Sequence, residues 1–140
     1  MGNSRGFTLM ELTIVLAVLA IIAAILIPTF LTTTDRARLR SDIQSAHVIN
    51  NAMELYRAER GRAVAGGADM AAVLTALHTA GYLRAMTPGG TQTDGAVWAV
   101  YGERVVVNIG GVTSDSVHRA ANNLPEEERR YISGLRAGTG

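Results

Sequence analysis

The chain has 140 residues, of which 48% are hydrophobic, so its length fits one domain with a short anchor. The net charge of +1 gives no case for bulk nucleic-acid binding, and every cationic residue is arginine, which excludes P-loop and Schiff-base lysines. With no cysteine, the chain has no disulfide framework, thiolate metal site or thiol nucleophile.

An uncharged apolar run extends from Leu12 to Leu31, interrupted only by Thr13, Pro28 and Thr29. A helix needs about 20 mostly apolar residues to cross the hydrocarbon of a bilayer. The run contains no Ala-x-Ala cleavage site, which disfavours a conventional signal peptide. A buried core helix is disfavoured because the rest of the chain is too small to surround it. We therefore expect a membrane anchor.

The charged residues on the two sides of this run favour opposite membrane orientations. Arg5 on the amino side favours a cytoplasmic N-terminus, whereas Arg36, Arg38 and Arg40 on the other side favour the opposite orientation. If the N-terminus is cytoplasmic, something other than flanking charge must set the topology.

Glu11 is a carboxylate at the edge of the apolar run. Acids inside membranes are costly and usually functional, with a partner that balances the charge. The alternative is that Glu11 lies at headgroup level and faces water. Position alone leaves both interpretations open.

The segment Gly6-Phe7-Thr8-Leu9-Met10-Glu11 closely resembles the processing motif of type IV prepilins and type II secretion pseudopilins. In that family a short basic leader ends in glycine, phenylalanine follows, and glutamate is the fifth residue after the cut. Arg5-Gly6, Phe7 and Glu11 occupy those places here, and Pro28 matches a proline common in the family.

The resemblance implies that residues 1–6 are a leader, cleaved by a prepilin peptidase between Gly6 and Phe7, and that the new amine of Phe7 is N-methylated. It also implies that Glu11 neutralises the terminal amine of a neighbouring subunit during assembly. Further implied partners are other copies of the chain, a pilus assembly ATPase and a platform protein. The implied location is the bacterial inner or cytoplasmic membrane, crossed once with the N-terminus in the cytoplasm, and then a periplasmic or extracellular filament.

Three departures from the family pattern leave the subfamily open. A C-terminal disulfide loop is impossible without cysteine. Residues 61–64 stand where many type II pseudopilins have a tyrosine-proline pair, and no acid cluster has calcium-loop spacing.

An amphipathic stripe follows the apolar run, so one helix is expected from about Phe7 to Arg60. Residues 7–34 would form its transmembrane and assembly half and residues 35–60 its amphipathic half. Pro28 should bend this helix or break one hydrogen bond. The expected buried stripe is Leu39, Ile43, Ala46, Ile49, Met53 and Tyr56, while Asp35, Arg36, Arg40, Asp42, Glu54 and Arg57 occupy the other faces.

Residues 61–140 are expected to form a small globular head. Its first predicted helix runs from Met70 to Ala80, with Asp69 as N-cap and Gly81 at its end. Two β-prone runs, Ala96–Tyr101 and Val105–Ile109, predict a hairpin, after loops at 61–68 and 87–95. Two shorter helices are predicted, over Asp115–Asn122 and after Pro125, and residues 136–140 are expected to fray.

These elements predict an α+β fold, in which a two-stranded or slightly larger antiparallel sheet packs on the amphipathic half of the long helix. His47, His78 and His118 have no zinc-ligand spacing, and no metal site, cofactor site or catalytic constellation is visible. The arginines at 36–62 could give at most a weak contact with DNA or anionic lipid, because acids lie between them.

The predicted function is that of a structural subunit of a type IV pilus or pilus-like filament, not an enzyme. A pseudopilin of type II secretion or competence DNA uptake is the alternative within the same family. A single-pass membrane-tethered binding domain is the more distant alternative.

Overall fold

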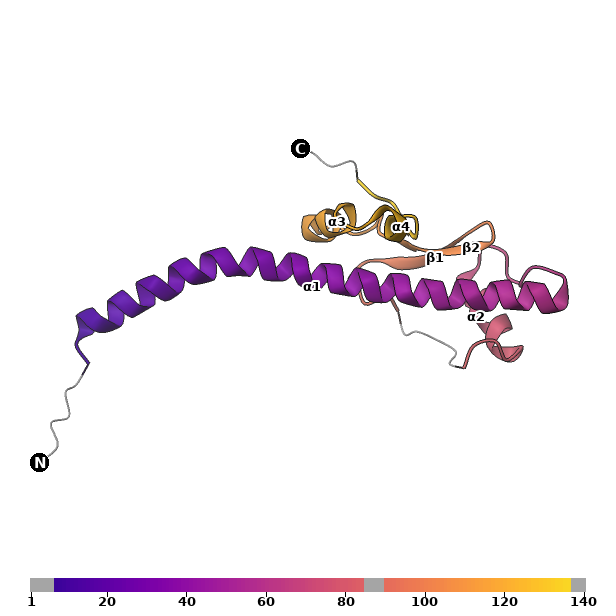
Figure 1. Cartoon of the computed structure of the whole chain (residues 1–140), viewed down its shortest axis with the longest axis horizontal. Coiled ribbons are helices and arrows are strands. Elements are labelled where there is room, and N and C mark those ends of the chain that lie inside the picture. Colours follow the sequence, from indigo (N-terminus) through magenta and orange to yellow (C-terminus); the bar gives the residue numbers. More distant parts are fainter. Residues whose placement is uncertain (1–6, 85–89, 137–140) are drawn as a thin grey trace, which may run out of the picture.

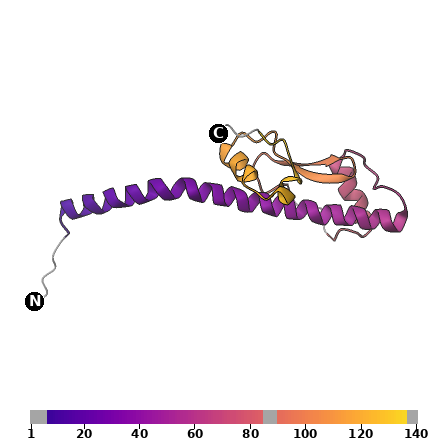
Figure 2. The same cartoon turned by 45° about the horizontal axis from the view of Figure 1, so that its top comes forward.

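A computed structural model of the chain describes residues 7–84 and 90–136 (Figure 1). The long helix α1 (Leu9–Arg60) carries a small head along its C-terminal half, and Figure 2 shows the same arrangement from a second angle. The predicted leader at 1–6, part of the predicted loop at 87–95 and most of the expected frayed tail lie outside the described residues. The elements in chain order are α1 (Leu9–Arg60), α2 (Met70–Thr79), β1 (Val97–Tyr101), β2 (Arg104–Asn108), α3 (Asp115–Asn122), α4 (Glu126–Arg129) and β3 (Ile132–Ser133).

Helix α1 has 52 residues, which corresponds to about 78 Å at 1.5 Å per residue. It begins after the N-cap Thr8 and ends at Gly61, whose N–H donates to the carbonyl of Arg57 at 2.9 Å. The helix is continuous through position 28 and curves along its N-terminal half (Figure 1). The side chain of Pro28 lies outside the described part, so its assignment as the cause of a kink stays a prediction.

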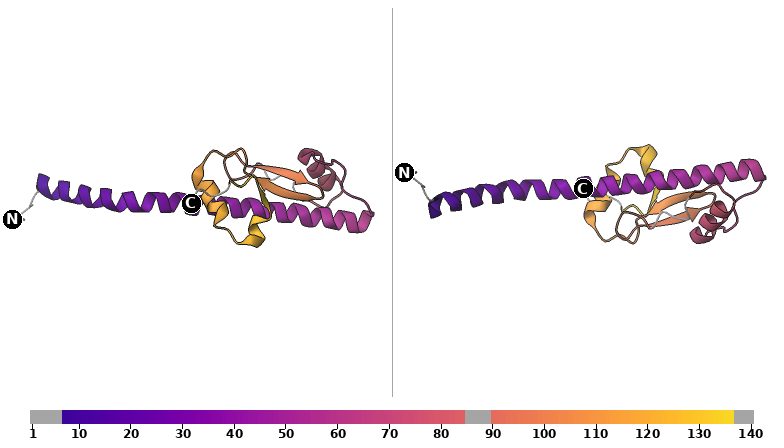
Figure 3. Two further views of the ribbon diagram at one scale, coloured as in Figure 1. Left: turned by 90° about the horizontal axis from the view of Figure 1, so that it is seen from above. Right: turned by 90° about the horizontal axis from the view of Figure 1, so that it is seen from below.

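The head packs on the stripe of α1 that the sequence predicts. Met53 is half-buried, whereas Leu39, Ile43, Ala46, Ile49 and Tyr56 are buried. The opposing side of the core comes from β2, α2 and α3, which lie along this half of α1 when it is viewed from above and below (Figure 3). The α+β, pilin-like architecture expected from the sequence is confirmed.

Asp42 was expected on a face of α1 away from the core, and this is wrong. The residue is only 2% exposed, and its carboxylate accepts the backbone N–H groups of Gln92 at 2.6 Å and Thr93 at 2.9 Å. The loop before β1 crosses α1 here, and its backbone donors need acceptors once they leave water. A carboxylate with two such bonds is tolerated where an unpaired one would be costly.

The sheet contains a third strand, in the order β1-β2-β3. β1 and β2 form the predicted antiparallel hairpin through Gly102-Glu103, and Gly102 has the positive φ of +61° that a two-residue hairpin turn favours. β3 instead pairs with β2 in parallel, so the expectation of a wholly antiparallel sheet needs correction. The N–H of Val107 donates to the carbonyl of Tyr131 at 2.8 Å.

Asn50 of α1 continues the ladder where β3 stops. Its side-chain amide donates to the carbonyl of Val105 at 3.0 Å and accepts the Val105 N–H at 2.7 Å. One buried side chain thus satisfies both backbone groups of a strand residue. This contact sets the position of the sheet along α1.

The helices of the head have the predicted boundaries to within a residue or two. The Asp69 carboxylate caps α2 by accepting from the N–H of Ala71 at 3.0 Å. At the other end, the N–H groups of Gly81 and Tyr82 donate to the carbonyls of His78 and Leu77, which is the Schellman arrangement of a helix C-terminus.

Candidate assembly site

The first turn of α1 forms a capping box. Thr8 is the N-cap, and its hydroxyl accepts the N–H of Glu11 at 3.2 Å. One oxygen of the Glu11 carboxylate, Oε2, accepts the N–H and the hydroxyl of Thr8, both at 2.9 Å. A glutamate three residues after a threonine cap is the pattern that satisfies helix N-terminal donors in both directions.

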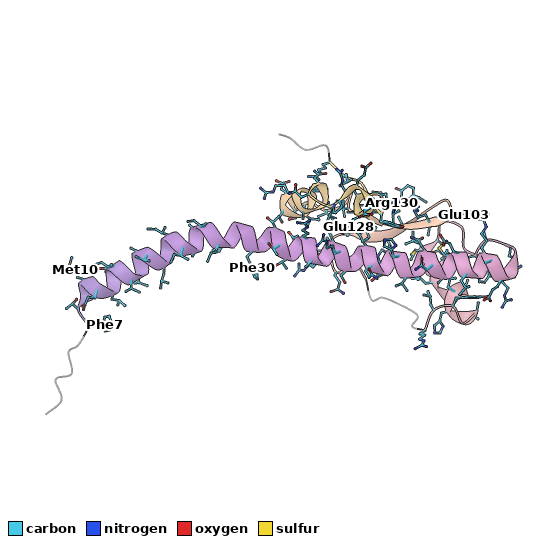
Figure 4. All side chains as sticks on the ribbon, in the orientation of Figure 1. Phe7, Met10, Phe30, Glu103, Glu128 and Arg130 are labelled. Carbon is cyan, nitrogen blue, oxygen red and sulfur yellow. The ribbon has the colours of Figure 1, made fainter. Side chains whose placement is uncertain are left out.

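Sequence reasoning placed Phe7 and Glu11 but missed Thr8. The signal was present, because Thr8-x-x-Glu11 before an apolar run is a capping-box pattern. Phe7 precedes the helix and is 82% exposed, and it lies with Met10 at the free end of α1, far from the head (Figure 4). Gly6, the other side of the predicted cleavage bond, lies outside the described residues.

Glu11 retains capacity for a second partner. Within the described chain its other oxygen, Oε1, has no hydrogen-bond or ion-pair partner. The side chain is exposed on the helix surface. The carboxylate can therefore accept from a cation that another molecule brings, and the contact with Thr8 would then be shared or replaced.

The N-terminal half of α1, residues 9–31, forms a bare segment, in which the described side chains stay exposed. Its apolar side chains are exposed, apart from those at 28 and 29, which are not described. Phe30 near its end points away from the helix without contacting the head (Figure 4). Within the described residues, α1 is the one helix long and apolar enough to cross a membrane. A helix that is apolar on all sides and uncovered fits a membrane anchor.

The arginines after the bare segment are partly engaged by the head. Arg40 forms an ion pair with Glu128 at 3.1 Å, and Arg57 forms one with Glu103. Figure 4 labels the two glutamates, which the head contributes. Arg36 donates to the carbonyl of Asn123 at the C-terminus of α3, where the helix dipole favours a cation.

The three histidines do not meet, and the described residues contain no group of His, Asp and Glu that could hold a metal. His118 is buried and bonds the carbonyl of Val112 at 3.0 Å. The ring of His47 lies against that of Tyr131, with centroids 3.9 Å apart. His118 is thus a packing residue within the head, and His47 packs against the head from α1.

Comparison of the sequence with known proteins identifies its family. Residues 1–27 match the family model described as the prokaryotic N-terminal methylation motif. A fimbrial protein of Moraxella nonliquefaciens is 31% identical over 105 residues, which cover 74% of this chain and 68% of that protein. The chain belongs to the type IV pilin and pseudopilin family. Its members are structural subunits, so the prediction that the chain is not an enzyme is confirmed.

Other pilin-family relatives match over shorter stretches. The type IV wide pilus major component PilA4 of Thermus thermophilus is 57% identical over 37 residues, or 26% of this chain and 28% of that protein. The type II secretion system core protein G of Klebsiella michiganensis is 25% identical over 60 residues, which cover 43% of this chain and 42% of that protein. The chain thus spans less than half the length of these two relatives. No solved structure matches the chain significantly.

Proposed function

We propose that this chain is a structural subunit of a type IV pilus or pilus-like filament that polymerises through α1. The carrying observation is the bare apolar segment of α1, with a carboxylate in its first turn that retains an open acceptor. Prepilin peptidase cleaves between Gly6 and Phe7 and methylates the Phe7 amine. The mature chain would then begin at Phe7, one residue before Thr8, the N-cap of α1.

The physical basis of assembly is charge compensation in an apolar medium. A lone carboxylate and a lone ammonium are each costly to keep in hydrocarbon, and bringing them together relieves both costs. Glu11 of one subunit accepts from the Phe7 amine of the next, which favours lateral association and sets the axial register. The bare segments then cover one another in the filament core.

The subunit crosses the inner or cytoplasmic membrane once, with its N-terminus in the cytoplasm, before assembly. The head then lies on the far side, and assembly requires an ATPase and a platform protein. The uncovered apolar segment of α1, which is long enough to cross a bilayer, supports a single crossing.

A pseudopilin of type II secretion is the second candidate, and the likeness to core protein G favours it. Both candidates share processing and assembly. What distinguishes them is whether the filament extends beyond the cell surface or stays in the periplasm. Surface filaments in sheared material support the pilus. Short periplasmic filaments, together with a secretion defect on deletion, support the pseudopilus.

The deciding experiment is mass spectrometry of the mature N-terminus, from membranes and from sheared material. The expected result is N-methylated Phe7, and Gly6→Ala should leave the precursor uncut. A chain that keeps residues 1–6 in cells that contain the peptidase would contradict the proposal.

Glu11→Leu separates a filament subunit from a permanently tethered binding domain. The variant of a subunit should be inserted and processed, yet fail to enter filaments. A tethered domain would insert equally well and lose no function. Cell fractionation, with quantification of sheared filament, distinguishes the two outcomes.

A further inference from the structure

A hollow of about 370 Å³ opens at the end of the head nearest the bare segment. α3 begins at this end (Figure 1). Leu31 and Arg38 of α1 line the hollow, together with Asp94 from the loop before β1 and Thr113 before α3. Its volume lies toward the lower end of the roughly 300–1,000 Å³ typical of small-ligand sites.

Two opposite charges line this hollow without pairing. Arg38 and Asp94 are both exposed, and in the described chain neither has an ion pair or a side-chain hydrogen bond. Asp35, which also lines the hollow, instead accepts the hydroxyl of Ser116. Opposite charges that are held apart in one hollow suit a ligand that carries both signs.

The hollow lies at the level of lipid headgroups if α1 spans the membrane, and the inference rests on that part of the proposed function. Leu31 ends an apolar run whose length of about 30 Å equals the hydrocarbon thickness. Arg38 follows about 10 Å further along the axis. Because helical side chains incline toward the helix N-terminus, its guanidinium reaches back toward the bilayer.

We propose that this hollow binds the headgroup of a zwitterionic phospholipid that bears a primary ammonium, of the phosphoethanolamine class. Arg38 donates to the phosphate, which guanidinium groups bind in bidentate fashion. Asp94 accepts from the ammonium, and the Thr113 hydroxyl offers a further polar contact. The bound lipid holds the head against the bilayer until the subunit leaves the membrane.

The test is intact-complex mass spectrometry of the full-length chain in detergent micelles, with one lipid added at a time. Phosphatidylethanolamine should be retained about fivefold more than phosphatidylglycerol of the same acyl chains, because only the former supplies a cation for Asp94. Arg38→Gln and Asp94→Asn should each reduce phosphatidylethanolamine retention about threefold, and the double variant about tenfold.

The control is the double variant Glu54→Gln and Arg62→Gln, which removes one charge of each sign near the C-terminal end of α1, Glu54 within the helix and Arg62 in the loop after it. Both residues are exposed, and this variant should retain the lipid like the original chain. Equal loss in the two double variants would overturn the proposal, and so would phosphatidylglycerol retention at or above that of phosphatidylethanolamine.

Unchanged retention in the Arg38 and Asp94 double variant would also overturn it. The fluorescence of Trp98 in each variant checks that the head remains folded. Asp94→Asn on its own tests the site without a substitution in α1, because Asp94 lies in the loop before β1. The assay needs neither processing nor polymerisation. A negative result therefore leaves the filament proposal standing, and failed assembly of Glu11→Leu leaves this one standing.

Discussion

Asp42 shows how a single residue can depend on partners that are remote in sequence. Its carboxylate bonds two backbone N–H groups 50 and 51 residues later in the chain. On a helical projection Asp42 resembles any exposed acid. The hydrophobic periodicity shows on which face of the helix a residue lies, but not whether a distant loop covers that face. The apolar stripe was predictable for the opposite reason, since its signal is local and repeated.

Replacing Asp42 tests this contact. Asp42→Ala leaves the buried N–H of Thr93 without an acceptor and should lower the free energy of unfolding by about 3 kcal/mol. Asp42→Asn keeps one acceptor and should cost less. Urea denaturation of the full-length chain in detergent, followed by the fluorescence of its one tryptophan, Trp98, measures both. Asp94→Ala, in the same loop but exposed, should change stability by less than about 0.5 kcal/mol.

Thr8 is the second residue with a testable role. Thr8→Val removes the hydroxyl that caps α1 and bonds the Glu11 carboxylate, at an expected cost of about 1 kcal/mol. Amides of the first turn should then exchange with deuterium about fivefold faster in micelles. Thr8→Ser should restore slow exchange, whereas Thr13→Val, one turn later, should leave it unchanged. Equally fast exchange in the serine variant would contradict the capping role.

At the scale of elements, the helices and strands that could be predicted are those whose own residues carry the pattern that identifies them. The helix at Asp115–Asn122 was predicted with its observed bounds, and the bounds of the two hairpin strands were predicted to within one residue. β3 was missed because it has two residues, too few for an alternating pattern, and because its partner lies about 25 residues earlier. The capping box in the first turn of α1 has a recognisable sequence pattern, but the proposed role of Glu11 in assembly was suggested by the family resemblance and not by that pattern.

The loop after β3 passes very close to the loop after β2. Gly134 has a φ of +75°, and a Cβ there would lie 2.3 Å from the backbone nitrogen of Gly110. Gly134→Ala should therefore cost about 3 kcal/mol, from both positive φ and overpacking. Gly102→Ala shares the positive φ but has open space around it, and should cost about 1 kcal/mol. Equal urea midpoints for the two variants would contradict this close approach.

Tyr82 connects the end of α2 to α1. Its hydroxyl donates to the Glu59 carboxylate at 2.5 Å, and this bond raises the pKa of Tyr82 above its ordinary value, although Arg60 opposes the shift. A raised folded-state pKa contributes stability that is fully present below the unfolded value of about 10 and is lost as pH rises through the folded value. Absorbance titration at alkaline pH should show that Tyr82→Phe removes a late-titrating tyrosine. Loss of an early one would contradict the shift.

At the scale of the whole molecule, the C-terminal half of α1 has one buried surface and one exposed surface. One side of its C-terminal half is buried under the head, and the other stays open as a continuation of the bare segment. The residues that form this open surface are uncharged and span 19 positions. They recur every three or four positions, which is the spacing of a seam between packed helices. Its members, all exposed, are Ala37, Ser41, Gln44, Val48, Asn51 and Leu55.

If the filament core extends along this seam, a charge placed in it should block assembly without unfolding the subunit. Val48 and Leu55 are 52% and 50% exposed in the single chain, so Val48→Asp and Leu55→Asp should fold and be processed normally. Within packed helices each carboxylate would be buried without a partner, and the yield of sheared filament should fall at least tenfold. Val97→Asp is the matched control, because Val97 is 56% exposed on β1 of the head, and its filament yield should stay near that of the original chain. Full yield from Val48→Asp, or loss of yield from Val97→Asp alone, would place the subunit contacts on the head instead of on α1.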